Sequence, residues 1–69
     1  MTIPKHLLIT SGSNELEFVK TIPQNKVQKE TMYVYKYSKV GSLSNKLGTE
    51  ISFNEFELKK HLSNYFKEI

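Results

Sequence analysis

The stretch Met32–Tyr37, with the sequence Met-Tyr-Val-Tyr-Lys-Tyr, places a tyrosine at every second position, a period typical of a β-strand. Successive side chains of a strand point to opposite faces, so Tyr33, Tyr35 and Tyr37 form one row. Because tyrosine favours strands, we expect a strand from about Thr31 to Val40. Two interpretations of the row stay open: it lines a small core, or it forms an exposed surface for a partner.

Upstream of this strand, the pattern predicts a β-hairpin. Two apolar-rich runs, Lys5–Thr10 and Glu15–Ile22, are separated by the turn-forming residues Ser11–Asn14. We expect Thr10 to face Glu15, a register that gathers four apolar side chains on one face of the hairpin. The four are Leu7, Ile9, Leu16 and Phe18.

Loop signals mark the remaining boundaries of the sheet. Pro23 cannot donate a hydrogen bond to a neighbouring strand, so we expect the second strand to end before it and a polar loop to cover Pro23–Glu30. A second loop is expected at Gly41–Gly48, because glycine, serine and asparagine are concentrated there. Thr49–Ser52 is then expected to form a short fourth strand.

The last predicted element is an amphipathic helix, and its start can be placed in two frames. Either Ser52 is the N-cap and Glu55 completes a capping box, or Asn54 is the N-cap and Glu57 completes it. The hydrophobic staple is Ile51 with Phe56 in the first frame and Phe53 with Leu58 in the second. The predicted apolar stripe consists of Leu58, Leu62, Tyr65, Phe66 and Ile69, with Lys59, Lys60, Ser63 and Lys67 on the far side.

Together these elements predict one α+β domain over residues 1–69. Its expected architecture is a small antiparallel sheet of three or four strands, formed by the N-terminal hairpin and the third strand, with the C-terminal helix packed on one face. The helix is expected to cover the apolar face of the hairpin. A domain of 69 residues lies close to the lower size limit for a single hydrophobic core, and no cysteine is present to add a disulfide.

The composition narrows the function classes. All ten basic residues are lysine and all seven acidic residues are glutamate, and the net charge of +3 is mild. Without arginine, bidentate readout of bases is not expected. The preference for residues with AT-rich codons indicates an AT-rich source genome, such as a low-GC bacterium, a phage or another mobile element. With no long apolar run and no signal-peptide pattern, we expect a cytoplasmic protein.

Catalytic and metal sites are not expected. The sequence lacks cysteine and aspartate, and it contains no glycine-rich phosphate loop. His6 and Glu17 fit an ordinary cross-strand polar pair better than a catalytic one. The set formed by His6, Glu15 and Glu17 is of a kind that occurs often by chance, so we expect no metal and no cofactor.

We therefore expect a non-enzymatic binding protein, a regulator or inhibitor that contacts a protein partner and that can also form a homodimer. Its expected contact residues are Leu8, Val19, Tyr33, Tyr35 and Tyr37. The alternative is a nucleic-acid-binding module that stacks bases on tyrosines and contacts phosphates through lysines. Its residues would be Tyr33, Tyr35, Lys36, Tyr37, Lys39, Lys46, Lys59, Lys60 and Lys67.

Overall fold

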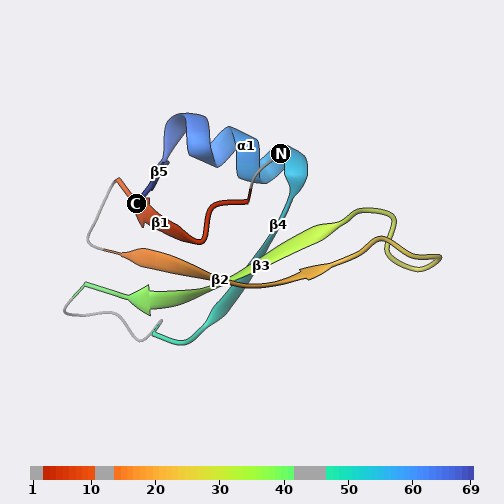
Figure 1. Ribbon diagram of the computed structural model, residues 1–69, viewed down its shortest axis with the longest axis horizontal. Coiled ribbons are helices and arrows are strands. Elements are labelled where there is room, and N and C mark those ends of the chain that lie inside the picture. The colour runs from red at the N-terminus through yellow and green to blue at the C-terminus, as the bar shows by residue number, and fades with distance from the viewer. Residues whose placement is uncertain (1–2, 11–13, 42–46) are drawn as a thin grey trace.

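A five-stranded antiparallel sheet carries one helix across one of its faces (Figure 1). The computed structural model describes residues 3–10, 14–41 and 47–69. The elements are β1 (His6–Ile9), β2 (Glu15–Ile22), β3 (Met32–Lys39), β4 (Glu50–Asn54), α1 (Glu55–Asn64) and β5 (Phe66–Glu68). The strand order is β4-β3-β2-β1-β5. The predicted α+β class is confirmed, with five strands in place of the three or four expected.

The hairpin of β1 and β2 forms as predicted, but the predicted register is wrong by two residues. Leu7 faces Leu16 and Leu8 faces Glu15, so Thr10 has no partner in β2. Instead, the amide and the hydroxyl of Thr10 both donate to the carbonyl of Tyr65, at 2.8 and 2.9 Å. Because side chains alternate with a period of two, this offset leaves the predicted apolar face unchanged.

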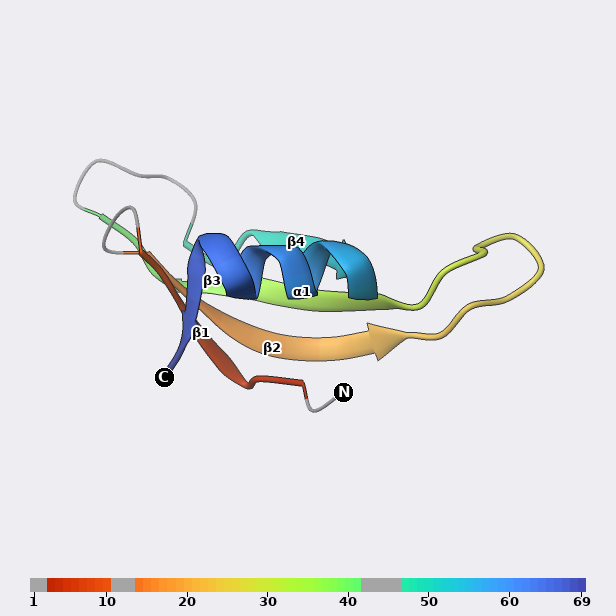
Figure 2. The same ribbon diagram turned by 90° about the horizontal axis from the view of Figure 1, so that it is seen from above.

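The strands β2 and β3 form a long two-stranded arm. Their pairing runs to Ile22 opposite Met32, and β2 ends before Pro23 as predicted. Figure 2 shows the end of the arm projecting beyond the helix and the other strands. This arm contributes to an elongated shape with extents of 41 × 24 × 15 Å.

The predicted fourth strand is present and is longer at its C-terminal end, since β4 continues to Asn54. Most of the loop predicted before it, residues 42–46, lies outside the described residues. The last residue of that loop, Gly48, has a φ of 81°, and its amide donates to the carbonyl of Tyr37 at 2.9 Å. Glycine adopts this left-handed conformation without steric cost, which allows the tight entry into β4.

The helix α1 begins in the second of the two predicted frames and ends earlier than predicted. Asn54 is the N-cap, with a complete capping box to Glu57. The chain leaves the helix at Tyr65, and the following residues form the short edge strand β5, in which Phe66 faces Ile9. The apolar spacing at the C-terminus is therefore shared between a helix and a strand, and the prediction of one continuous helical stripe is wrong. At ten residues α1 is too short to span a bilayer, and the described residues contain no longer helix.

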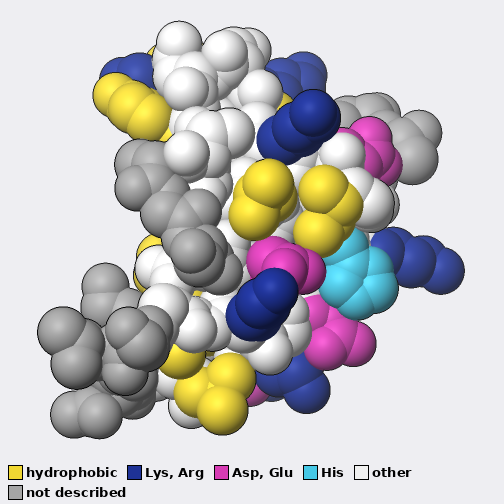
Figure 3. Space-filling model, turned by 90° about the vertical axis from the view of Figure 1, so that its left-hand side faces the viewer, with side chains coloured by type: hydrophobic (Ala, Val, Ile, Leu, Met, Phe, Trp, Pro, Cys, Tyr) yellow, Lys and Arg dark blue, Asp and Glu magenta, His cyan; other side chains and the backbone are white. Residues whose placement is uncertain are grey.

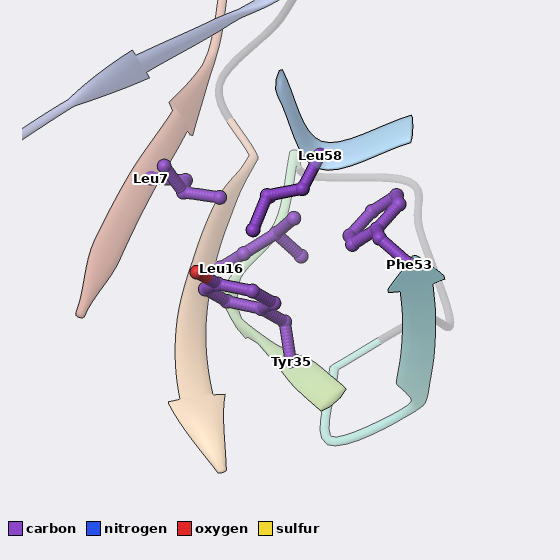
Figure 4. Close-up of a cluster of buried hydrophobic side chains, with 5 residues drawn as sticks. All are labelled: Leu7, Leu16, Tyr35, Phe53 and Leu58. Carbon is purple, nitrogen blue, oxygen red and sulfur yellow. The ribbon is translucent and has the colours of Figure 1, made fainter. Parts of the chain in front are cut away.

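The core lies between α1 and the sheet (Figure 4). Its buried side chains are Leu7, Leu16, Tyr35, Phe53 and Leu58. The ring of Tyr35 meets Phe18 and Phe53 edge to face, with centroid separations of 5.5 and 6.0 Å. The helix thus covers the predicted apolar face of the hairpin, and the row of tyrosines lies on this covered side of the sheet.

Candidate protein-binding groove

A groove of about 350 Å³ lies where the loop at the end of the arm, residues 23–31, meets the end of β4 and the start of α1. Its lining residues are Gln24, Lys29, Glu30, Thr31, Tyr33, Asn54, Glu55 and Phe56. The groove exists because the pairing of the arm ends at Met32, opposite Asn54 at the end of β4, and only the loop of residues 23–31 continues further, which leaves a step between this loop and the helix. A volume of this size accommodates one or two side chains of a partner.

Asn54 fixes the geometry of this step through both ends of its side-chain amide. The side-chain oxygen accepts a hydrogen bond from the backbone N–H of Glu57 at 2.7 Å, and the backbone N–H of Asn54 in turn donates to the Glu57 carboxylate at 3.1 Å. The Asn54 nitrogen donates to the carboxylate of Glu30 on the arm at 3.0 Å. One side chain therefore caps the helix and holds the end of the loop beside it.

Phe56 is the most exposed aromatic side chain in the described part of the chain, with 74% of its surface accessible. It stands in the first turn of α1, on the wall of the groove, while Tyr33 from β3 lies half-buried in the same groove. The staple of this helix is formed by Phe53 and Leu58, which are both in the core. Phe56 takes no part in that packing and faces solvent.

The groove carries charges of both signs. Glu30 is held by Asn54, and Glu55 forms an ion pair with Lys59 one turn along the helix, at 3.3 Å. Lys29 is the one lysine among the lining residues. With two glutamates and one lysine, the lining is net negative on a chain whose net charge is +3.

The predicted row of tyrosines is only partly accessible. Tyr35 is fully buried, so it offers no surface to a partner, whereas Tyr33 and Tyr37 are half-buried. The Tyr35 hydroxyl donates to the carbonyl of Pro4 at 2.7 Å. Burial, with a smaller contribution from the charge of Glu68, raises the pKa of Tyr35 to about 12. The row thus belongs mainly to the core, the first of the two interpretations given above.

The other predicted protein contacts lie apart from the groove. Leu8 is half-buried on the sheet face that α1 does not cover, and Val19 is 39% exposed at an irregularity in the pairing of β2 with β3. Tyr37 borders a second depression of about 260 Å³, next to Leu47, which is 64% exposed. Of the five predicted contact residues, only Tyr33 lines the larger groove.

The lysines of the nucleic-acid alternative are not gathered on one surface. Lys36 and Lys39 lie on the uncovered sheet face, Lys59 and Lys60 on α1, and Lys67 on β5, while Lys46 lies outside the described residues. On the uncovered face Lys36 stands between Glu17 and Glu50, and Lys39 forms an ion pair with Glu15 at 3.6 Å. Figure 3 likewise shows lysines and glutamates interspersed at one end of the molecule.

No metal-binding cluster is present within residues 3–10, 14–41 and 47–69. His6 and Glu17 face one another directly across β1 and β2, rather than diagonally as the predicted register had them. Both belong to the mixed polar face of the sheet.

Comparison of the chain with protein-family models, with curated proteins and with solved structures finds no match.

Proposed function

We propose that this chain is a small protein-binding module, a regulator or inhibitor that acts by stoichiometric contact, and that its partner binds at the groove between the arm and the start of α1. The observation that carries the proposal is the exposure of Phe56 on the groove wall, at 74%. Aromatic side chains dominate the binding energy of protein interfaces. Burying a side chain of this size against a partner contributes about 1.5–3 kcal/mol.

The arrangement of the remaining residues also supports a protein partner over a nucleic acid. Base stacking needs exposed aromatic faces and a continuous basic surface. Tyr35 lies in the core, and the lysines on the uncovered face alternate with glutamates. The groove, in contrast, combines an aromatic wall with polar rims, as the centre of a protein interface does.

The proposal is tested with the immobilised full chain and a nuclease-treated lysate of a low-GC bacterium. Three proteins are compared: the wild type, Phe56→Ser, and Tyr65→Ser as a matched control. Tyr65 is also an exposed aromatic residue, at 53%, but it lies at the other end of α1. We expect the wild type and Tyr65→Ser to retain the same protein and Phe56→Ser to lose it, while circular dichroism shows all three equally folded.

If Phe56→Ser and the wild type retain the partner protein equally, the contact surface lies outside the groove. Titration with labelled single- and double-stranded oligonucleotides at low and moderate salt covers the alternative. Micromolar binding that weakens steeply with salt would favour the nucleic-acid-binding module instead.

A further inference from the structure

The tip of the arm is a loop shaped by its own polar side chains. The side-chain oxygen of Asn25 accepts hydrogen bonds from the amides of Val27 and Gln28, each at 2.8 Å. The Gln28 side chain donates to the carbonyls of Ile22 and Glu30, at 3.4 and 2.9 Å. These bonds tie the loop to the end of β2 and to Glu30, two residues before β3, so its backbone is ordered before any partner binds. Such pre-organisation lowers the entropic cost of binding.

The same hydrogen bonds leave one apolar side chain pointing into water. Val27 is 92% exposed, the largest fraction among the exposed hydrophobic residues of the described chain. Lys26 precedes it and forms no ion pair within the described residues, whereas Lys29 lies among the lining residues of the groove. The one acidic residue of the loop, Glu30, is turned back to Asn54. The tip therefore presents an exposed apolar side chain beside one lysine, Lys26.

The groove beside this loop has an aromatic and mainly acidic lining. It offers Phe56 and Tyr33, with the carboxylates of Glu30 and Glu55 and the single lysine Lys29 at its rim. The tip of the same molecule does not fill it, since Val27 is not among the lining residues and stays almost fully exposed. Figure 2 shows why: the arm carries its tip outward, away from the start of α1.

We propose that the groove binds the arm tip of a second copy of this chain, so that two molecules form a symmetric dimer with their arms exchanged. Val27 of each copy packs against Phe56 and Tyr33 of the other, and Lys26 lies near Glu30 and Glu55. One pair of complementary surfaces is thereby used twice, as in other isologous interfaces. The inference rests on the proposed function, because it assumes that the groove binds protein side chains. It adds a regulation of that site, since the dimer covers the groove and another partner must compete with the arm.

Sedimentation equilibrium from 5 µM to 1 mM in low salt measures the self-association directly. We expect a reversible monomer–dimer equilibrium in the wild type. Val27→Ser or Phe56→Ser removes the apolar contact at both symmetric sites. Each site is expected to raise the dissociation constant of the dimer about tenfold, so the two together raise it about a hundredfold. Lys26→Glu is also expected to weaken the dimer, by charge repulsion. Ile69→Ser is the matched control, because Ile69 is 56% exposed but lies at the C-terminus, outside the groove and the tip.

A mixed-label NMR experiment tests the docking geometry. The chain contains no cysteine, so Lys26→Cys gives one site for a nitroxide label. The label removes the Lys26 charge but leaves the apolar contact of Val27 in place, so the proteins are mixed at 1 mM to offset the weaker association. Copies that carry the nitroxide but no ¹⁵N are mixed with ¹⁵N-labelled wild type. We expect the amide signals of Tyr33 and Phe56 in the ¹⁵N-labelled copies to broaden. A nitroxide attached at Ile69→Cys is expected to leave these signals unchanged.

Three results would overturn the inference: a monomer at 1 mM, broadening that falls outside the groove, or a dimer that Val27→Ser and Phe56→Ser leave unchanged. All three are distinguishable from failure of the proposed function. A monomeric chain that still loses its lysate partner in Phe56→Ser keeps the groove as a binding site for a foreign protein. A dimer unaffected by Val27→Ser and Phe56→Ser would show self-association through another surface, such as the edge of β4.

Discussion

Replacing Tyr35 by phenylalanine removes one buried hydroxyl and changes almost nothing else in the core. The hydroxyl donates to the Pro4 carbonyl at 2.7 Å, and Pro4 is itself buried, so in Tyr35→Phe that carbonyl has lost its partner. An unsatisfied buried acceptor costs about 1–3 kcal/mol. For a chain of 69 residues the unfolding entropy is about 145 cal/mol/K, so each kcal/mol lowers Tm by about 7 °C. We therefore expect a loss of about 7–20 °C at neutral pH.

At alkaline pH the difference in stability between Tyr35→Phe and the wild type is expected to become smaller. The pKa of Tyr35 is raised from 10.0 to about 12 by burial, so between these values the unfolded chain loses a proton that the folded chain retains. The stability linked to this group is fully present below pH 10 and is lost as the pH rises towards 12. By pH 11 the loss is about 1.4 kcal/mol in the wild type. Tyr35→Phe has no such group, so the gap between the two proteins closes by that amount.

Urea unfolding followed by far-ultraviolet circular dichroism, at pH 8, 10 and 11, measures both effects. The two proteins share every other side chain, so all other contributions cancel in the difference. An equal gap in unfolding free energy at pH 8 and pH 11 would contradict the raised pKa of Tyr35. Equal stability of Tyr35→Phe and the wild type at pH 8 would show that the hydrogen bond to Pro4 contributes nothing.

Two further substitutions test the core and the start of the helix. Leu58→Ala removes a fully buried side chain of α1 and is expected to cost about 2–5 kcal/mol, measured by urea unfolding. Asn54→Ala is expected to cost about 1 kcal/mol by loss of the cap, while Ser52→Ala, at an exposed position of β4, leaves stability within about 0.5 kcal/mol. Equal losses in these last two variants would contradict the assignment of Asn54 as N-cap.

The faces of the sheet were predictable because they depend only on alternation. A register error of two residues in the hairpin moved Leu7 from Phe18 to Leu16 without moving it off the helix-covered face. What the local pattern lacked was the competing partner of Thr10, which is the Tyr65 carbonyl, 55 residues away in the sequence. A register predicted from the turn assumes that the two strands pair only with each other. Here the end of the first strand forms hydrogen bonds with the C-terminal segment instead.

The end of the helix was not predictable for a related reason. Tyr65, Phe66 and Ile69 continue the helical spacing, but β1 has a free edge that the chain can reach only by leaving the helix. In β5, Phe66 packs against the core from the sheet side, opposite Ile9. The gain from pairing an open edge of the sheet is a tertiary effect, and neither spacing nor propensity records it.

The position of the candidate site follows from which of the two capping frames is occupied. With Ser52 as the cap, Phe56 would be the fourth helical residue and would close the staple against Ile51, leaving no exposed aromatic beside the arm. With Asn54 as the cap, Phe53 and Leu58 form the staple instead, and Phe56 becomes a solvent-exposed residue of the first turn. The side-chain nitrogen of Asn54 can then donate to Glu30. A shift of two residues thus creates both the groove wall and its link to the arm. The sequence contained both frames, and the packing of Phe53 and Leu58 into the core explains why the second is occupied.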